Sequence, residues 1–413
     1  MDPKYAGTIY WLLDSRFDFL LPLFSQEFGI DLQHIVFVHS HHWKERRRLH
    51  KIFVTKPEKD VVRLLEPDDI NRIFSRNLDL GSETMLISFT GAGLPEGAHL
   101  TTLTAAGQVA DRWNDKWEQF VFFQKMNLLT PITYQFHNFS EMQKQLPLLT
   151  GRHGRLVIKK PCLSGGYMMR VVSSKADLER YQQSIQNGSQ NEVFLVSEYI
   201  PNQQSFASAA VVLKNGEVFD LDMVTEQVIY QETAYEGLIF PAFLDDRNVR
   251  KIREITMKVG KELGNSGYYG FFNIDFIFGN DGRMYIAEIN ARLGFGTILA
   301  ACLYGNGFWK MMQGICVSDI RKPVGRLILG KIKGQEGRTY FGLHSVSQIW
   351  EWFDRGHGFF RTFFCGTDEP EKLAYGSFIG VFGEHLSLED TREDVLKRFW
   401  KKCLEYYDGM ENC

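Results

Sequence analysis

The stretch FFNIDFIFGNDGRMYIAEINAR, residues 271–292, decides the fold of this chain. Its two halves, 271–278 and 284–290, are rich in aromatic and β-branched residues, as strands usually are. The residues between them, 279–282, are Gly-Asn-Asp-Gly, which is typical of a turn. The pattern therefore predicts a β-hairpin, and the polar positions within it indicate the function.

Four polar residues of this hairpin are expected on one face. Side chains alternate between faces along a strand, so Asn273 lies with Asp275, and Glu288 lies with Asn290. A four-residue loop pairs Asp275 with Glu288. Buried carboxylates need a cation, and Mg²⁺ takes one or two of them together with phosphate and water. We therefore expect Asp275, Glu288 and Asn290 to bind a metal, with Arg292 as a fixed cation beside it. The alternative is a hairpin whose acids face solvent.

Composition limits the class of protein. A chain of 413 residues is longer than one core usually serves, so two or three domains are expected. The net charge of −3 gives no bulk attraction to nucleic acid or membrane. Six cysteines without a CxxC pair suit a reducing cytoplasm better than a disulfide framework or a zinc site. The N-terminus lacks a signal-peptide layout and no run of about 18 apolar residues occurs, so we expect a cytoplasmic protein without a membrane partner.

Strand and helix patterns divide the chain into three parts. The first part alternates strands with a helix-like segment and predicts a small α/β layer, with strands at 8–14, 35–39 and 85–91. The second part begins with a charged helical segment, 107–127, and continues with strands at 156–160, 170–173 and 194–200, a hairpin around 214–216 and an amphipathic helix at 248–263. The third part predicts strands at 325–332, 338–346, 358–367 and 375–383, and a helix at 389–407.

Four features of the second part occur in a recognisable order. They are Lys116 in the charged helix, VIKKP followed by LSGGYMMRVV, SEYIP at 197–201, and the acidic hairpin ending in EINAR. This order resembles the ATP-grasp fold, which includes carbamoyl phosphate synthetase, biotin carboxylase and D-alanine–D-alanine ligase. The resemblance implies an α/β (α+β) protein with an N-terminal pre-ATP-grasp domain (1–106), an ATP-grasp module that holds the nucleotide between two subdomains (107–320) and a C-terminal α+β extension (321–413).

The resemblance also suggests an ATP-binding lysine. Lys159 and Lys160 point to opposite faces of one strand, so only one of them can meet a nucleotide. Lys160 precedes Pro161, as the ATP-binding lysine of the family does. We therefore expect Lys160 to bind phosphate and Lys159 to be a solvated strand residue.

Other nucleotide contacts are implied in the same way. They are expected from Lys116, Gly165, Gly166, Glu198, Tyr199 and Ile200. Backbone N–H groups of a glycine loop can approach phosphates closely, and a backbone segment can pair with adenine. The alternatives are a solvated helix lysine and a simple Gly-Gly turn. Gln203 and Gln204 stand where the family often has an acid that binds the ribose.

The function implied by the resemblance is that of an ATP-dependent carboxylate–amine ligase. Such an enzyme uses ATP and Mg²⁺, with Mn²⁺ as a substitute, and passes through an acyl phosphate. Arg292 is the expected catalytic residue, and the substrates are a small carboxylate and an amine, such as amino acids or peptides. No nucleic-acid partner is expected, and an oligomer is left open. The alternatives are a kinase that phosphorylates a hydroxyl and a non-catalytic nucleotide-binding protein.

Overall fold

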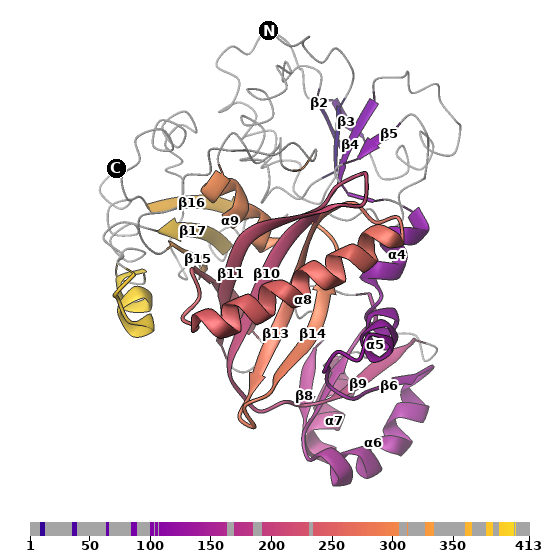
Figure 1. The fold of residues 1–413 in the computed structure, drawn as a ribbon. Helices are drawn as coiled ribbons and strands as arrows, with labels where there is room; N and C mark the ends of the chain where they lie inside the picture. Colours follow the sequence, from indigo (N-terminus) through magenta and orange to yellow (C-terminus); the bar gives the residue numbers. More distant parts are fainter. Residues whose placement is uncertain are drawn as a thin grey trace, which may run out of the picture.

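The computed structural model of this chain contains three β-sheets (Figure 1). The residues that it describes are 9–12, 35–38, 63–65, 84–88, 100–102, 104–105, 107–162, 169–184, 192–230, 234–304, 312, 327–333, 360–365, 377–382, 388–399 and 401. Within these residues no helix is long and apolar enough to cross a membrane.

The N-terminal sheet has five parallel strands in the order β3-β2-β1-β4-β5. They are β1 (Ile9–Leu12), β2 (Ile35–Val38), β3 (Arg63–Leu65), β4 (Thr84–Ser88) and β5 (Leu100–Thr102). The three strands predicted here, in 8–14, 35–39 and 85–91, are confirmed. A parallel sheet of this kind is the expected α/β layer.

The central sheet has eight strands in the order β14-β13-β10-β11-β12-β15-β17-β16, and each neighbouring pair is antiparallel. Its strands are β10 (Asn202–Val212), β11 (Val218–Tyr230), β12 (Ala234–Phe240), β13 (Gly270–Gly279), β14 (Met284–Asn290), β15 (Leu327–Lys333), β16 (Phe360–Cys365) and β17 (Ser377–Phe382). Because β15 pairs with β12, the strands beyond residue 320 continue this sheet.

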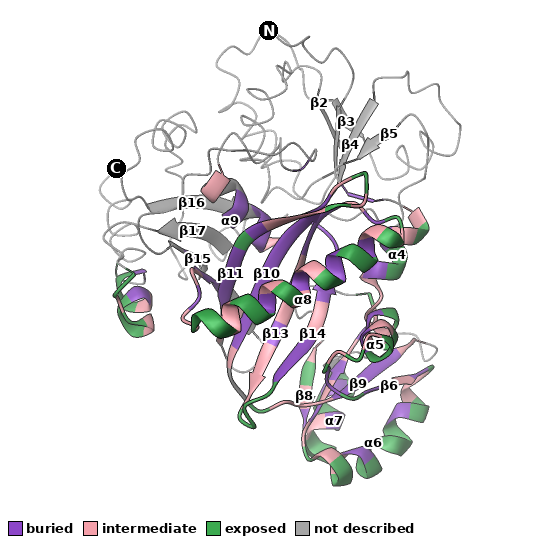
Figure 2. Ribbon diagram, viewed as in Figure 1, coloured by how far each residue is buried: buried purple, intermediate pink, exposed green. Residues whose placement is uncertain are grey.

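One face of the central sheet is covered by α8 (Asp246–Asn265), which confirms the predicted amphipathic helix. The helix begins at its N-cap Asp245, whose side chain accepts from the N–H of Asn248. Figure 2 shows exposed positions along α8 and buried positions on the strands beneath it. Gly260 allows this close packing, because a Cβ there would lie 2.8 Å from Val218 Cγ1 and 2.9 Å from Phe272 Cζ.

A smaller antiparallel sheet forms a separate layer with the order β6-β9-β7-β8. Its strands are β6 (Thr133–Phe136), β7 (Leu156–Lys159), β8 (Arg170–Val172) and β9 (Phe194–Glu198). Helices α6 (Phe139–His153) and α7 (Lys175–Ser184) cover it and share an apolar core with its strands. The side chains of Leu156 and Ile158 face that core. Lys159, the next residue along β7, therefore points to the opposite face of the sheet.

Two short helices connect these layers. The segment 107–127 was expected as one helical stretch, but the structure divides it into α4 (Gly107–Asn114) and α5 (Lys116–Lys125). Asp115 separates them because its side chain caps α5, accepting from the N–H of Trp117 at 2.7 Å. This cap places Lys116 at the first position of α5. A further helix, α9 (Phe295–Tyr304), follows the hairpin.

The hairpin β13–β14 has the predicted pairing at its polar end. Asp275 pairs with Glu288, and Asn273 pairs with Asn290. Nearer the turn the register differs by one, since Phe276 pairs with Ile286, so Ala287 is an extra residue in β14. This β-bulge changes which face the following side chains occupy. Met284 and Ile286 contact the apolar core, and beyond the bulge Ile289 does so, which leaves Glu288 and Asn290 on the other face.

Candidate active site

Asp275 on β13 is held by three amide side chains. Its Oδ1 accepts from Gln227 Nε2 at 2.9 Å and from Asn273 Nδ2 at 3.0 Å, and its Oδ2 accepts from Asn290 Nδ2 at 2.9 Å. Gln227 lies on β11, and β10 separates that strand from β13. The carboxylate orientation is therefore fixed by residues from three strands.

Arg292 lies two residues after the end of β14 and is buried, with 6% of its surface exposed. Its Nη1 donates to Asn114 Oδ1 at 3.0 Å, and its Nη2 donates to Asn290 Oδ1. The planar guanidinium is thus held between the end of α4 and the end of β14. Asn290 gives its N–H to Asp275 and its oxygen to Arg292, so this amide connects the predicted catalytic arginine to the predicted metal carboxylate.

Lys116 and Glu288 form an ion pair between α5 and β14. Lys116 Nζ lies 3.5 Å from Glu288 Oε2, with 9% and 23% of the two side chains exposed. The N–H of Lys116 also donates to the carbonyl of Pro161 at 3.0 Å. The first residue of α5 therefore contacts both the hairpin and the segment that follows β7.

The pKa values of the two hairpin carboxylates are shifted in opposite directions. Burial and the negative charge of Glu288 raise the pKa of Asp275 to about 7, against the opposing effect of Asn290 and Arg292. Burial also tends to raise the pKa of Glu288, but the charges of Lys116, Arg292 and Lys159 outweigh it and bring that pKa below its usual value. Two carboxylates at one site thus have only partial compensation from the surrounding cations.

The two lysines at the end of β7 have different surroundings. Lys160 is buried with 8% exposed, its Nζ forms an ion pair with Glu192, and it lies 3.5 Å from the centre of the Phe194 ring. Lys159 faces the other side of the strand, toward Glu288 and Lys116. Burial and the charge of Lys116 lower its pKa to about 8, with Glu288 acting in the opposite direction. The structure therefore brings Lys159, and not the expected Lys160, into the group around Glu288.

The segment Glu198, Tyr199 and Ile200 lies at the end of β9, between the small sheet and β10. The N–H groups of Glu198 and Tyr199 donate to the carbonyls of Ile132 and Arg155 at 2.9 and 3.0 Å. A base placed against these two residues would therefore have to use their carbonyl oxygens. The carboxylate of Glu198 accepts from the N–H of Ile132 and lies 3.6 Å from His153 Nδ1.

Some predicted residues are not placed in the site. Gly165 and Gly166 lie outside the described residues. Gln203 and Gln204 lie at the start of β10, and their contact with a ribose stays a prediction.

Sequence reasoning missed three polar residues around this site, which are Asn114, Gln119 and Gln227. A fourth, Lys159, was expected to be solvated. Asn114 and Gln119 lie in the predicted charged helical segment. Asp115 between them is a residue type that often caps a helix, and it was the sequence signal for a break in that segment. Gln227 carried no signal, because its contact depends on strand pairing across β10.

The donor set suits a hard divalent cation. Asp275 and Glu288 supply carboxylate oxygens on paired strands, and Asn290 supplies an amide. No group of three His, Cys, Asp or Glu side chains suited to a metal occurs in the described part of the chain. Two carboxylates are nevertheless sufficient for Mg²⁺, which completes its shell with phosphate and water. Because burial and the charge of Glu288 raise the pKa of Asp275, a cation bound beside it would favour its charged form.

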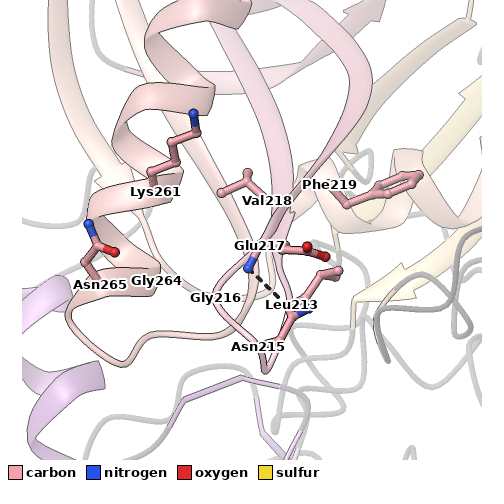
Figure 3. A pocket seen from close by; sticks show the side chains of 9 residues that line it. All are labelled: Leu213, Asn215, Gly216, Glu217, Val218, Phe219, Lys261, Gly264 and Asn265. Carbon is pink, nitrogen blue, oxygen red and sulfur yellow. Dashed lines mark hydrogen bonds between the residues drawn. The ribbon is translucent and has the colours of Figure 1, made fainter.

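A surface hollow of about 730 Å³ occurs elsewhere on the central sheet (Figure 3). It is formed by the β10–β11 turn and the end of α8, and it is lined by Leu213, Asn215, Gly216, Glu217, Val218, Phe219, Lys261, Gly264 and Asn265. None of the predicted site residues lines it.

Comparison with known families identifies the module that carries these residues. Residues 113–296 match the family model of the ATP-grasp domain. The chain therefore contains an ATP-grasp domain, as the order of its motifs predicted. The matched segment includes Lys116, Lys159, Lys160 and the whole hairpin with Arg292.

Two curated relatives show what this chain is similar to. A [butirosin acyl-carrier protein]–L-glutamate ligase from Niallia circulans is 29% identical over 147 residues, which are 35% of this chain and 35% of that protein. The carbamoyl phosphate synthase large chain from Pyrococcus furiosus is 20% identical over 313 residues, which are 74% of this chain and 26% of that protein. The chain thus spans about a third or less of the length of these relatives.

Solved structures agree in fold. The biotin carboxylase domain of a 2-oxoglutarate carboxylase from Hydrogenobacter thermophilus has a TM-score of 0.66 and 15% identity, covering 91% of this chain and 86% of its own. An N5-carboxyaminoimidazole synthetase from Staphylococcus aureus has a TM-score of 0.63 and 12% identity, covering 97% of this chain and 98% of its own. At such identities the likeness concerns the fold alone.

Proposed function

We propose that this chain is an ATP-dependent ligase that joins a carboxylate to an amine. One observation carries the proposal: three cations, Lys116, Lys159 and Arg292, act on the half-buried carboxylate of Glu288, which pairs with Asp275. Such a concentration of opposite charges suits a nucleoside triphosphate with its metal ion, because the cations can meet the phosphates and the carboxylates can meet the metal. The division into 1–106, 107–320 and 321–413 and the cytoplasmic location are part of the same proposal.

The phosphates would be bound from the helix and the small sheet. Lys116 lies at the first position of α5 with its ammonium beside Glu288. Lys159 takes the place expected for Lys160, because its side chain is on the face of β7 toward this group. Compact ammonium groups are good point charges for phosphate oxygens. The Gly165-Gly166 loop and the backbone of 198–200 would complete nucleotide binding.

Asp275, Glu288 and Asn290 would hold Mg²⁺, or Mn²⁺ in its place. The bound ion would supply a positive charge that neutralises the phosphates during transfer. Gln227 and Asn273 would keep Asp275 oriented, since both amides donate to its Oδ1. These residues would hold the ligand oxygens in place before the nucleotide arrives.

The proposed reaction has two steps. A carboxylate oxygen of the first substrate attacks the γ-phosphorus of ATP, the bond to the β-γ bridging oxygen breaks, and ADP leaves. An amine then attacks the acyl carbon, the bond to the phosphate oxygen breaks, phosphate leaves and the amine loses a proton. Charge develops on oxygens in both steps, and the guanidinium of Arg292 would stabilise it. Asn114 and Asn290 hold that guanidinium in place.

An amino acid or a carrier-bound amino acid is the substrate class favoured by similarity. The relative from Niallia circulans is named for joining L-glutamate to an acyl-carrier protein. The residues after Arg292 are small or apolar at Gly294 and Gly296, and an added Cβ at Gly294 would meet nothing nearer than Asn273 Oδ1 at 4.0 Å. A Cβ at Gly296, by contrast, would lie 3.3 Å from Phe271 Cζ, so the open space is limited to Gly294.

The test is to trap the acyl phosphate. Purified protein is incubated with ATP, Mg²⁺, hydroxylamine and pools of carboxylates that include L-glutamate, and hydroxamate and ADP are measured. We expect a hydroxamate with the correct carboxylate, and equal amounts of amide, ADP and phosphate once the amine is added. Arg292→Ala should reduce both steps, while Arg283→Ala on the exposed turn of the same hairpin should not.

Two other outcomes would replace this proposal. A stable phosphate ester on a hydroxyl substrate, without hydroxamate from any carboxylate, would identify a kinase. Nucleotide binding without turnover of ATP against any pool would identify a non-catalytic nucleotide-binding protein.

A further inference from the structure

Gln119 lies on α5, and its buried side chain has 2% of its surface exposed. Its Nε2 donates to the carbonyl of Ile289 at 2.7 Å and to the carbonyl of Trp113 at 2.8 Å. Its Oε1 accepts from the N–H of Ile289 at 2.8 Å. Both ends of the amide are therefore engaged, which fixes its orientation as well as its position.

These contacts close the edge of the central sheet. β14 is the terminal strand of that sheet, and an edge strand leaves N–H and C=O groups without a strand partner. Gln119 bonds to both backbone groups of Ile289, as a neighbouring strand would. Ile289 stands between Glu288 and Asn290, so α5 is attached to the hairpin between two predicted metal ligands.

The same side chain determines where two other site residues lie. Lys116 and Gln119 are three residues apart on α5, and residues at that spacing share a helix face. Fixing Gln119 to β14 therefore brings the ammonium of Lys116 to Glu288. The bond to Trp113 holds the last turn of α4, where Asn114 accepts from Arg292.

We propose that Gln119 is a positioning residue of the nucleotide–metal site, an inference that rests on the proposed function. The three hydrogen-bond partners of its side chain are all backbone groups, and it acts by holding α4 and α5 against β14. A methionine of similar length would leave the three backbone groups without this partner. A glutamate would keep the acceptor for the N–H of Ile289 but would place a carboxylate against two carbonyl oxygens.

The experiment compares Gln119→Met with two controls. Gln124→Met changes an exposed glutamine of the same helix, and Val259→Ala opens a small cavity in the apolar core under α8, on the face of the sheet away from Glu288. Binding of a non-hydrolysable ATP analogue is measured by calorimetry with and without Mg²⁺, and each variant is melted thermally. We expect Gln119→Met to weaken Mg²⁺-dependent binding by about tenfold or more, as loss of a supporting contact to a metal site does.

The controls separate a positioning effect from a loss of stability. Gln124→Met should bind like the wild type, and Val259→Ala should lower the melting temperature without weakening binding. If Gln119→Met does not fold, Gln119→Glu decides, and we expect an intermediate loss of binding. Gln119 variants that bind as well as Val259→Ala at a similar melting temperature would overturn this inference alone. A wild-type protein that binds no nucleotide would overturn the proposed function and this inference together.

Discussion

The central sheet and the small sheet prepare their charged side chains for the candidate site in different ways. On the central sheet, Asp275 accepts from three amides, and Arg292 donates to two. On the small sheet, burial lowers the pKa of the Lys159 ammonium to about 8. One side is thus held by several hydrogen bonds, whereas the other presents a charge that burial disfavours. We infer that the hairpin is organised before substrate binds, and that Lys159 becomes fully charged when an anion arrives.

The largest effect is expected at Glu288, because three cations and the predicted metal depend on it. Glu288→Gln keeps the size of the side chain but removes its charge, so ATP turnover should fall by about two orders of magnitude or more. Steady-state ADP release measures this, and circular dichroism checks the fold. Glu118→Gln, on the exposed side of α5, is the control. Wild-type turnover by a folded Glu288→Gln protein would contradict the site.

The next effect distinguishes Lys159, at the end of β7, from Lys160, which follows it. Lys159→Met should weaken binding of an ATP analogue by about tenfold or more, because a hydrogen bond to a charged group contributes about 1.5–3 kcal/mol. Lys160→Met should instead lower stability by about 1 kcal/mol through loss of its contact with the Phe194 ring. Calorimetry and thermal melting of both variants measure the two effects. A greater loss of binding in Lys160→Met would restore the expectation drawn from the sequence.

The third effect concerns pH. In the protein without nucleotide, Lys159 loses its proton near pH 8. A bound phosphate would stabilise the charged ammonium and so raise the pKa of Lys159. Nucleotide affinity should therefore fall as pH rises above about 8, by at most about tenfold per pH unit. Binding titrations between about pH 7 and pH 9.5 measure this, because that range brackets the pKa of Lys159. In Lys159→Arg the guanidinium stays charged, so the decline should be absent. An identical decline in both proteins would assign it to another group.

The smallest effect is expected at Gln227 on β11. Gln227→Met removes one of three amide donors to Asp275, and a single hydrogen bond contributes about 0.5–1.5 kcal/mol. Mg²⁺-dependent turnover should therefore fall by less than about tenfold, because Asn273 and Asn290 still hold the carboxylate. A magnesium titration of ADP release measures this. A loss as large as that of Glu288→Gln would mean that Gln227 contacts substrate directly.

The hairpin was predicted from sequence because its information is local. Alternation along 271–278, the turn residues and the polar positions predicted the pairing of Asp275 with Glu288, which the structure confirms. The bulge at Ala287 was not foreseen, although it is what turns Glu288 away from the apolar core. A run of strand-forming residues does not reveal an extra residue, because the bulge depends on how the partner strand pairs.

Lys159 and Lys160 show the limit of that reasoning. Alternation predicted that Lys159 and Lys160 face opposite sides, and their surroundings do differ. Which side faces the hairpin depends on where the helices of the small sheet pack, and Leu156 and Ile158 settle this by joining their core. The motif with Pro161 favoured Lys160, whereas packing places Lys159 toward Glu288 and Lys160 toward Glu192; which of the two binds phosphate stays a prediction.

The sequence by itself indicated many of the strands, the amphipathic helix, the order of the motifs and the charged residues that the ATP-grasp domain carries, because strand alternation and turn chemistry act over a few residues. Tertiary structure alone decided which side chains meet. Asn114, Gln119 and Gln227 reach the hairpin from α4, α5 and β11. Hydrogen bonds between residues more than 40 positions apart depend on how the sheets and helices pack, and no local pattern in the sequence records that packing.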